Sequence, residues 1–150
     1  MATSKLIGEK ELKEKLEKLG SRARASLLTA TQAGGEVIRE EANRNAPEPH
    51  VVMGHEKAQN SQAEVEIGPD EEHWYYRFFE FGAGPHEIKA KTAAALAFEG
   101  RSGLVITQAV QHPGMAAVPF LRPAMDGKRK ETVAEMGQVF RREIDRLVED

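Results

Sequence analysis

The stretch EEHWYYRFFEFGAG, residues 71–84, holds six of the nine aromatic residues in this chain of 150 residues. Trp74 and Phe78 stand four positions apart, a second aromatic pair follows one position later, and a glycine ends the run. This spacing predicts a helix that begins at Asp70 and presents two adjacent aromatic stripes. We therefore expect the main core, or a large contact between subunits, to be centred here, with the polar Glu80 near its rim.

Upstream of this stretch, the sequence predicts a strand preceded by a polar segment. Residues 63–67 alternate between apolar and charged side chains, so that Val65 and Ile67 would face the core or a partner. Residues 47–62 are polar and rich in turn-forming residues, which indicates an exposed, mobile loop or a loosely formed hairpin arm. A mobile loop of this kind would become ordered only on contact with a partner. Its candidate partner-binding residues are His50, Val51, Val52 and Met53.

The N-terminal third of the chain has helical periodicity. Residues 7–19 predict a short amphipathic helix that ends at Gly20, and residues 21–45 predict a second helix that ends before a proline. Gly34 and Gly35 lie in the middle of the second helix, so either the helix bends there or another backbone packs closely against it. The predicted inward face of this helix consists of Leu27, Ala30, Gly34, Val37, Ile38 and Ala42.

Downstream of the aromatic stretch, short elements alternate with turns. Residues 86–88 are expected to be extended, and the alanine-rich residues 92–98 to form a short helix. The β-branched run at residues 104–106 predicts a strand, and a hairpin turn between Phe98 and Leu104 accounts for the glycines and the serine there.

A proline-rich arm, residues 112–124, precedes the last predicted helix, residues 127–148. Its three prolines disfavour regular helix and predict a stiff, extended connector. Two roles remain open for Phe120 and Leu121: they anchor the last helix on the core, or they dock near the aromatic stretch of the same subunit or of a neighbour. The apolar residues of the last helix recur every three or four positions: Val133, Met136, Phe140, Ile144 and Leu147.

These elements predict one α+β domain over residues 1–150. In this domain, N-terminal helices and a long C-terminal helix pack on a small, mainly antiparallel sheet.

Composition argues against several classes of function. The net charge is −3 and no basic block stands out, so wholesale binding of nucleic acid is not expected. The chain has no cysteine, no apolar leader and no long apolar run, which predicts a soluble protein made in the cytoplasm, without a membrane partner. The five histidines show no ligand spacing, and Ser102, His112 and Asp126 lack the context of a hydrolase triad. We therefore predict no catalytic residue, no metal, no cofactor and no small-molecule substrate.

Several motifs in chain order resemble the tail-component family of long-tailed bacteriophages. The motifs are Asn45-Ala46-Pro47, Tyr76-Arg77-Phe78-Phe79-Glu80-Phe81-Gly82, His112-Pro113-Gly114 and Val118-Pro119-Phe120-Leu121-Arg122-Pro123-Ala124. The resemblance spans nearly the whole chain, and the Glu-Phe-Gly and Pro-Phe-Leu-Arg-Pro-Ala motifs are fairly specific together. Residues 48–55 depart from the Thr-Gly-x-Leu-x-x-Ser segment that is frequent in the family.

The resemblance implies a non-catalytic assembly role in the virion, at the neck between head and tail. It implies a tail-completion subunit that forms a ring, with six copies expected, at the head-proximal end of the tail and helps to join the tail to the head. The implied partners are other copies of the chain, tail tube or terminator proteins, and head connector proteins. DNA would at most pass through the lumen.

A ring needs two different surfaces on each subunit. The candidate interface residues come from the aromatic stretch and the proline-rich arm: Trp74, Tyr75, Phe79, Phe81, Pro119, Phe120, Leu121 and Arg122. The alternative function is a cytoplasmic, non-catalytic interaction module that dimerises through Val133, Met136 and Phe140 of the last helix.

Overall fold

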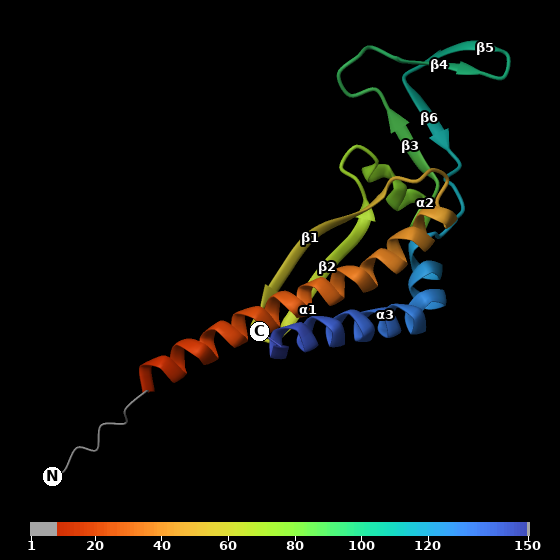
Figure 1. The fold of residues 1–150 in the computed structure, drawn as a ribbon. Coiled ribbons are helices and arrows are strands. Elements are labelled where there is room, and N and C mark those ends of the chain that lie inside the picture. Colours follow the sequence, from red (N-terminus) through yellow and green to blue (C-terminus); the bar gives the residue numbers. More distant parts are fainter. Residues whose placement is uncertain (1–8, 150) are drawn as a thin grey trace.

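A computed structural model describes residues 9–149 as two long helices with a hairpin on one side and a projecting arm (Figure 1). Helix α1 (Glu9–Asn45) lies in the middle of the body. Helix α3 (Leu121–Glu149) packs antiparallel along one side of α1, and strands β1 (Val51–Gln59) and β2 (Gln62–Pro69) pack on another. The fold class is α+β, as predicted.

Helix α1 is continuous, so the prediction of two helices divided at Gly20 is wrong. A glycine inside a helix costs only about 1 kcal/mol relative to alanine, and the lysines, glutamates and leucines around Gly20 are good helix formers. The predicted start at Ile7 lies outside the described residues. The predicted inward face from Leu27 to Ala42 is confirmed, because all of its members are buried or partly buried.

The two central glycines of α1 mark close packing. A Cβ atom added to Gly34 would overlap the side chain of Met136 in α3, and one added to Gly35 would lie 3.0 Å from the sulfur of Met53 in β1. The helix therefore passes between α3 and the hairpin at these two positions. Side chains, and not the backbone of another element, fill the space that the glycines leave.

Residues 51–59 form the first strand of an antiparallel hairpin, so of the two alternatives for residues 47–62 the hairpin is confirmed and the loop is wrong. The Asn43 side chain accepts a hydrogen bond from the Val51 N–H and donates one to the Val51 carbonyl oxygen, both at 2.8 Å. These two bonds fix the start of β1 against α1. The strand predicted at residues 63–67 is confirmed as the central part of β2.

The aromatic stretch is less helical than predicted. A 3₁₀ turn (η1, Trp74–Tyr76) leads into the five-residue helix α2 (Arg77–Phe81), which ends at Gly82. Asp70 does not begin this helix; its carboxylate instead accepts a hydrogen bond from the His73 N–H at 2.9 Å in the preceding turn.

A projecting arm, residues 86–112, precedes the proline-rich segment and consists of two antiparallel strand pairs, of which only β4–β5 is a hairpin. Strand β3 (His86–Lys89) pairs antiparallel with β6 (Ala109–His112), and β4 (Leu96–Gly100) pairs antiparallel with β5 (Gly103–Thr107). The strand predicted at 104–106 and the turn before it are confirmed. The helix predicted at 92–98 is wrong, because a segment this short nucleates a helix poorly, and its last residues pair with the β-branched strand β5.

Helix α3 begins at Leu121, six residues before the predicted start, so the extended part of the proline-rich arm ends at Phe120. Pro123 is the third residue of the helix. A proline is tolerated there because the first N–H groups of a helix have no partner within it.

The core is small and lies where the long helices meet the hairpin and η1. Its buried apolar residues are Ala42, Val51, Tyr76, Phe120 and Ala124. Of the six aromatic residues of the stretch, only Tyr76 is buried, whereas Trp74 is 60% exposed and Phe81 is 71% exposed. Of the two alternatives predicted for this stretch, core packing is therefore wrong for most of its rings, which lie on the surface, and a contact between subunits stays a prediction.

Candidate functional site

The two segments that carry the family motifs lie side by side. We call residues 79–84 and 113–122 the motif junction. Backbone hydrogen bonds join them: the Ala83 and Met115 N–H groups each donate to the other residue's carbonyl oxygen, and the Val118 N–H donates to the Phe79 oxygen at 2.7 Å. The Glu-Phe-Gly and Pro-Phe-Leu-Arg motifs are therefore parts of one structural unit.

Two glycines allow this close approach. Gly82 has a φ of 73° and Gly114 a φ of 82°, a region that side chains other than glycine rarely adopt. A Cβ atom at Gly82 would lie 2.9 Å from the Met115 oxygen, and one at Gly114 would overlap the Ala83 oxygen. The glycines of the Glu-Phe-Gly and His-Pro-Gly motifs are thus both required by the junction.

Glu80 lies at the centre of the junction, and the prediction that it lies near a rim is wrong. Glu80 is only 4% exposed. Its carboxylate accepts hydrogen bonds from the backbone N–H groups of Phe120 (2.8 Å), Leu121 (2.9 Å) and Arg122 (3.1 Å). These N–H groups belong to the beginning of α3, where the helix dipole favours a negative charge. Glu80 therefore caps α3 from a distant part of the sequence.

Arg122 completes the junction from α3. Its Nε donates to the Glu80 carboxylate at 3.0 Å, and a terminal nitrogen donates to the Glu80 carbonyl oxygen at 2.9 Å. Its guanidinium also lies over the Phe81 ring, 5.5 Å from the ring centre. Burial disfavours the charged carboxylate, but the hydrogen bonds from Leu121, Phe120 and Arg122 outweigh it and hold the pKa of Glu80 below its ordinary value.

Two of the predicted contact residues belong to the core of the subunit. Phe120 is 1% exposed and packs edge to face on Tyr76, with ring centres 5.9 Å apart. Val51, predicted in the partner-binding loop, is equally buried. Leu121 and Phe79 are partly buried against the same core, so the anchoring role predicted for Phe120 and Leu121 is confirmed.

The exposed aromatic residues within the stretch 71–84 are Trp74, Tyr75, Phe78 and Phe81, and we call these four residues the aromatic patch. Trp74 contacts both Tyr75 and Phe78 edge to face. Phe78 was absent from the predicted contact residues, although its position four residues after Trp74 already placed it on the same side of the turn. Pro119, Val52 and the Arg122 side chain are also exposed, whereas Met53 and His50 are partly buried.

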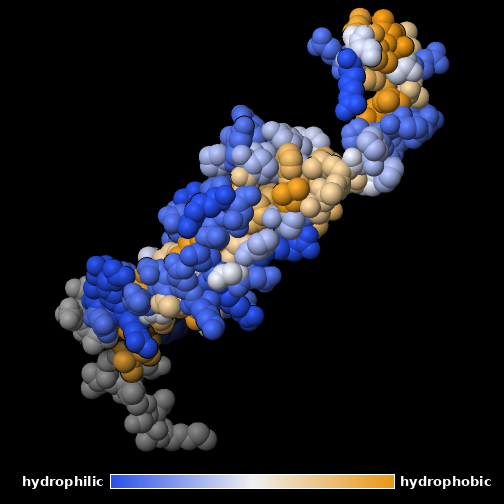
Figure 2. All heavy atoms as spheres, turned by 90° about the vertical axis from the view of Figure 1, so that its right-hand side faces the viewer, coloured by the Kyte–Doolittle hydropathy of each residue, from blue (hydrophilic) through white to orange (hydrophobic). Residues whose placement is uncertain are grey.

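A second apolar surface lies at the far end of the arm, and sequence reasoning missed it as a site. Figure 2 shows hydrophobic side chains gathered there, apart from the body. We call it the arm tip; its exposed residues are Phe98, Leu104, Val105 and Ile106. The signal in the sequence was the apolar run Leu104-Val105-Ile106. Successive side chains of a strand point to opposite faces, and a single two-stranded hairpin cannot bury apolar side chains on both faces.

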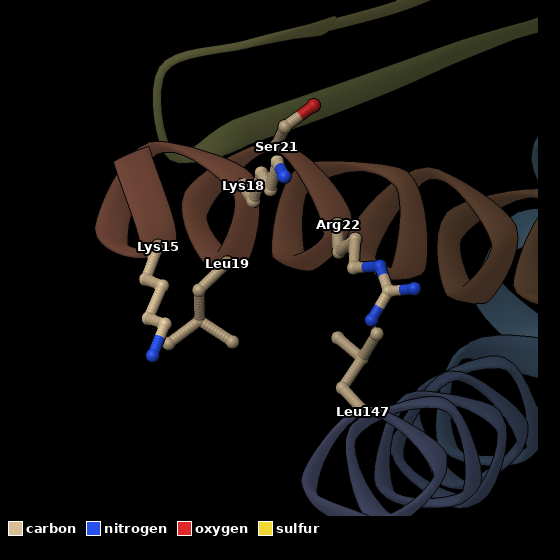
Figure 3. A pocket seen from close by; sticks show the side chains of 6 residues that line it. All are labelled: Lys15, Lys18, Leu19, Ser21, Arg22 and Leu147. Carbon is tan, nitrogen blue, oxygen red and sulfur yellow. The ribbon is translucent and has the colours of Figure 1, made fainter. Parts of the chain in front are cut away.

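A basic-edged hollow lies near the other end of the body. It is lined by Lys15, Lys18, Leu19, Ser21 and Arg22 of α1 and by Leu147 of α3. In Figure 3, Lys15, Leu19 and Arg22 extend from α1 toward the side on which α3 lies, and Leu147 extends back toward them. Leu19 in this lining and the two preceding leucines of α1, Leu12 and Leu16, are each more than half exposed.

The residues considered for a hydrolase triad lie on separate elements. Ser102 is in the β4–β5 turn at the arm tip, His112 ends β6 at the base of the arm, and Asp126 is in α3 (Figure 1). Within the described residues, one group of side chains has the composition and spacing to hold a metal ion: His50, Asp70 and His73. The spacing of the histidines in the sequence gave no sign of it.

The fold and the junction define a small α+β protein in which buried motifs fix the start of a long helix and leave two apolar surfaces exposed. Residues 10–82 match the family model HK97-gp10-like, described as "Bacteriophage HK97-gp10, putative tail-component". This match supports the resemblance to a tail-component family of tailed bacteriophages over the part of the chain that holds the Glu-Phe-Gly motif, and it agrees with a structural phage protein. The Pro-Phe-Leu-Arg-Pro-Ala motif lies outside the matched residues. The matched segment runs from α1 to Gly82 and includes Glu80.

Comparison with curated proteins and comparison with solved structures find no match for the chain. Among the described helices, none combines the length and the apolar composition that crossing a bilayer requires.

Proposed function

We propose that this protein is a tail-completion subunit that forms a ring at the head-proximal end of a phage tail and helps to join the tail to the head. The observation that carries the proposal is the presence of two separate apolar surfaces, the aromatic patch and the arm tip, on one subunit. A ring is built by heterologous contacts, in which one surface of a subunit meets a different surface of its neighbour.

The arm is built in a way that suits such a contact. Among the described elements, its strands make extensive contacts only with one another, and a single two-stranded hairpin is marginally stable in water. Leu104 is 71% exposed and Ile106 is 68% exposed. A neighbouring subunit that covers these side chains would both stabilise the arm and remove apolar surface from water.

The aromatic patch is the proposed receiving surface. Tryptophan, tyrosine and phenylalanine are enriched where protein surfaces associate, because they bury a large area with few rotatable bonds. The motif junction fixes Phe81 of this patch next to the start of α3, where the Arg122 guanidinium lies over its ring, and a prearranged contact residue reduces the entropy lost on association. The proposed partners outside the ring are tail tube or terminator proteins and head connector proteins, with six copies in the ring and DNA passing through its lumen.

The test compares the wild-type protein with the double variant Leu104→Asp, Ile106→Asp by light scattering and negative-stain imaging, alone and mixed with purified tails or head connectors. We expect rings, alone or on tail ends, for the wild type and none for the variant. Circular dichroism should show that the variant stays folded. Rings formed equally by the folded variant would contradict the role of the arm tip, and a wild type that forms no ring under any of these conditions would contradict the proposal.

The dimeric interaction module is disfavoured by one contact. Met136, a member of the proposed dimer face, packs against Gly34 of α1 in the same subunit, and Phe140 is partly buried. Val133 alone of the three is well exposed, at 63%. The variant Val133→Asp is therefore a matched control: it should leave rings intact, and a wild-type dimer that it dissociates would favour the module.

A further inference from the structure

Two loops at the base of the β1–β2 hairpin bring together side chains that lie apart in the sequence. His50 directly precedes β1, Asp70 directly follows β2, and His73 lies in the turn before η1. The Asp70 N–H donates to the His50 carbonyl oxygen at 3.0 Å and closes the hairpin at this end. The three side chains are partly buried, with 20–32% of each exposed.

One carboxylate faces both imidazole rings. Asp70 Oδ1 lies 2.6 Å from His73 Nδ1, and Asp70 Oδ2 lies 3.5 Å from His50 Nδ1. The two rings stack nearly parallel, with centres 3.4 Å apart, and both meet the Tyr76 ring edge to face. A second carboxylate is close by, since Glu48 Oε2 lies 3.2 Å from His50 Nε2.

This arrangement has the donor atoms and the spacing of a transition-metal site. One ligand atom from each of the three residues lies within 4.8 Å of the other two. Ligands bound about 2.0–2.1 Å from a tetrahedral zinc ion are roughly 3.3 Å apart, and the distances from Asp70 to the two ring nitrogens bracket this value. Imidazole nitrogens together with carboxylate oxygens suit zinc and its neighbours better than they suit magnesium or calcium.

We propose that His50, Asp70 and His73 bind a divalent transition-metal ion of the zinc type, with Glu48 as the nearest further carboxylate. The charge of the site favours a cation, because the carboxylates of Glu48 and Asp70 both face the two imidazole rings. The stacked rings must tilt so that the lone pairs in their planes point to a common centre. Their positions in loops at the hairpin base, partly open to solvent, allow that movement.

A bound ion would tie the loop after α1 to the loop before η1. Trp74 and Tyr75 of the aromatic patch follow His73 directly, and Tyr76 of the core comes next. The ion would therefore stabilise the segment that carries this patch. The proposal concerns the single subunit and does not depend on ring formation.

The chain offers a matched control in a second pair of histidines. His86 and His112 face each other across β3 and β6, with ring centres 5.0 Å apart, and they are not part of a three-ligand group among the described residues. The variants to compare are His50→Gln, His73→Gln and the control His86→Gln, each in untagged protein freed of metal by a chelator.

Two readouts test the site: the visible absorption of added Co²⁺, and the change in Tm on addition of ZnCl₂. In the wild type and the control we expect a saturable, roughly stoichiometric cobalt spectrum with nitrogen and oxygen ligation that zinc abolishes. The wild-type Tm should rise by roughly 5–10 °C at a zinc concentration about 100 times the dissociation constant. His50→Gln and His73→Gln should each weaken binding at least about tenfold.

Absence of a saturable cobalt spectrum and of a Tm shift in the wild type would overturn the proposal. The same follows if both site variants bind as tightly as the wild type, or if His86→Gln abolishes binding. Because Tm and absorption are measured on the isolated subunit, failure here is distinguishable from failure of the ring proposal.

Discussion

The Glu80 carboxylate accepts a hydrogen bond from the backbone N–H of Phe120 at 2.8 Å, across 40 positions of the sequence. This contact joins the Glu-Phe-Gly and Pro-Phe-Leu-Arg motifs of the chain into one structural unit. The first motif supplies the cap, and the second supplies the helix that is capped. The apolar Phe120 then lies in the core, one residue before α3 begins.

Replacing Glu80 with glutamine tests the cap. Glu80→Gln keeps the shape of the side chain but removes its charge, so the beginning of α3 and Arg122 lose a charged acceptor. We expect the free energy of unfolding to fall by about 1–3 kcal/mol. Urea unfolding followed by circular dichroism measures it, and Glu131→Gln, an exposed glutamate of α3 paired with Lys128, is the control that should change little. Equal stability of Glu80→Gln and the wild type would show that the charge does not matter.

The same carboxylate predicts a pH dependence of stability. The pKa of Glu80 is lower in the folded protein than in the unfolded chain, so its stabilising contribution is fully present above the unfolded pKa of about 4.3. The contribution is lost as the pH falls through the folded-state pKa. The difference in unfolding free energy between wild type and Glu80→Gln should therefore be constant from pH 7 to about pH 5.5 and shrink below about pH 4.5. A difference that grows on acidification would have the wrong sign for this cause.

Two glycines of α1 predict opposite effects of the same substitution. The Cβ atom added by Gly20→Ala would lie 3.8 Å from the end of the Arg24 side chain, which is an ordinary contact. This variant should therefore stabilise the protein by about 0.5–1 kcal/mol. Gly34→Ala gains the same helix propensity but forces Met136 and Thr132 away, and overpacking costs about 1–3 kcal/mol. We expect a net loss for Gly34→Ala, measured by thermal and urea unfolding. Two variants of equal stability would mean that α3 moves aside without cost.

Elements whose pattern reflects a buried face could be predicted from the sequence. The inward face of α1 and the strand at residues 63–67 both follow from local periodicity. Helix boundaries were less predictable, because glycine and proline often end a helix but do not always do so. A helix tolerates Gly20 in its interior at a modest cost, and it tolerates Pro123 in its first turn. Nothing in the local sequence shows whether such a glycine or proline ends the helix or is accommodated within it.

The candidate sites were harder to predict because they depend on long-range contacts. Glu80 was assigned to a rim, since its partners lie 40 positions or more away and no local rule buries an isolated glutamate. His50 and His73 have no ligand spacing along the chain, and the closure of the hairpin brings the Asp70 carboxylate next to both imidazole rings. For the aromatic stretch, core packing and a contact between subunits both stayed open, because a sequence does not show whether large apolar side chains face the interior or a partner.

Two phenylalanines, Phe120 and Phe81, allow a residue of the core to be compared with a residue of the proposed contact surface. Phe120 is buried against Tyr76, so Phe120→Ala should lower the free energy of unfolding by about 3–5 kcal/mol. Phe81 is 71% exposed and the Arg122 guanidinium lies over its ring, so Phe81→Ala should cost the isolated subunit less than about 1 kcal/mol. If the aromatic patch receives a neighbour, Phe81→Ala should nevertheless weaken ring formation or tail binding in light scattering and imaging. A Phe81→Ala protein that is as stable and assembles as well as the wild type would remove Phe81 from the contact, and a large loss of stability would show that it belongs to the core.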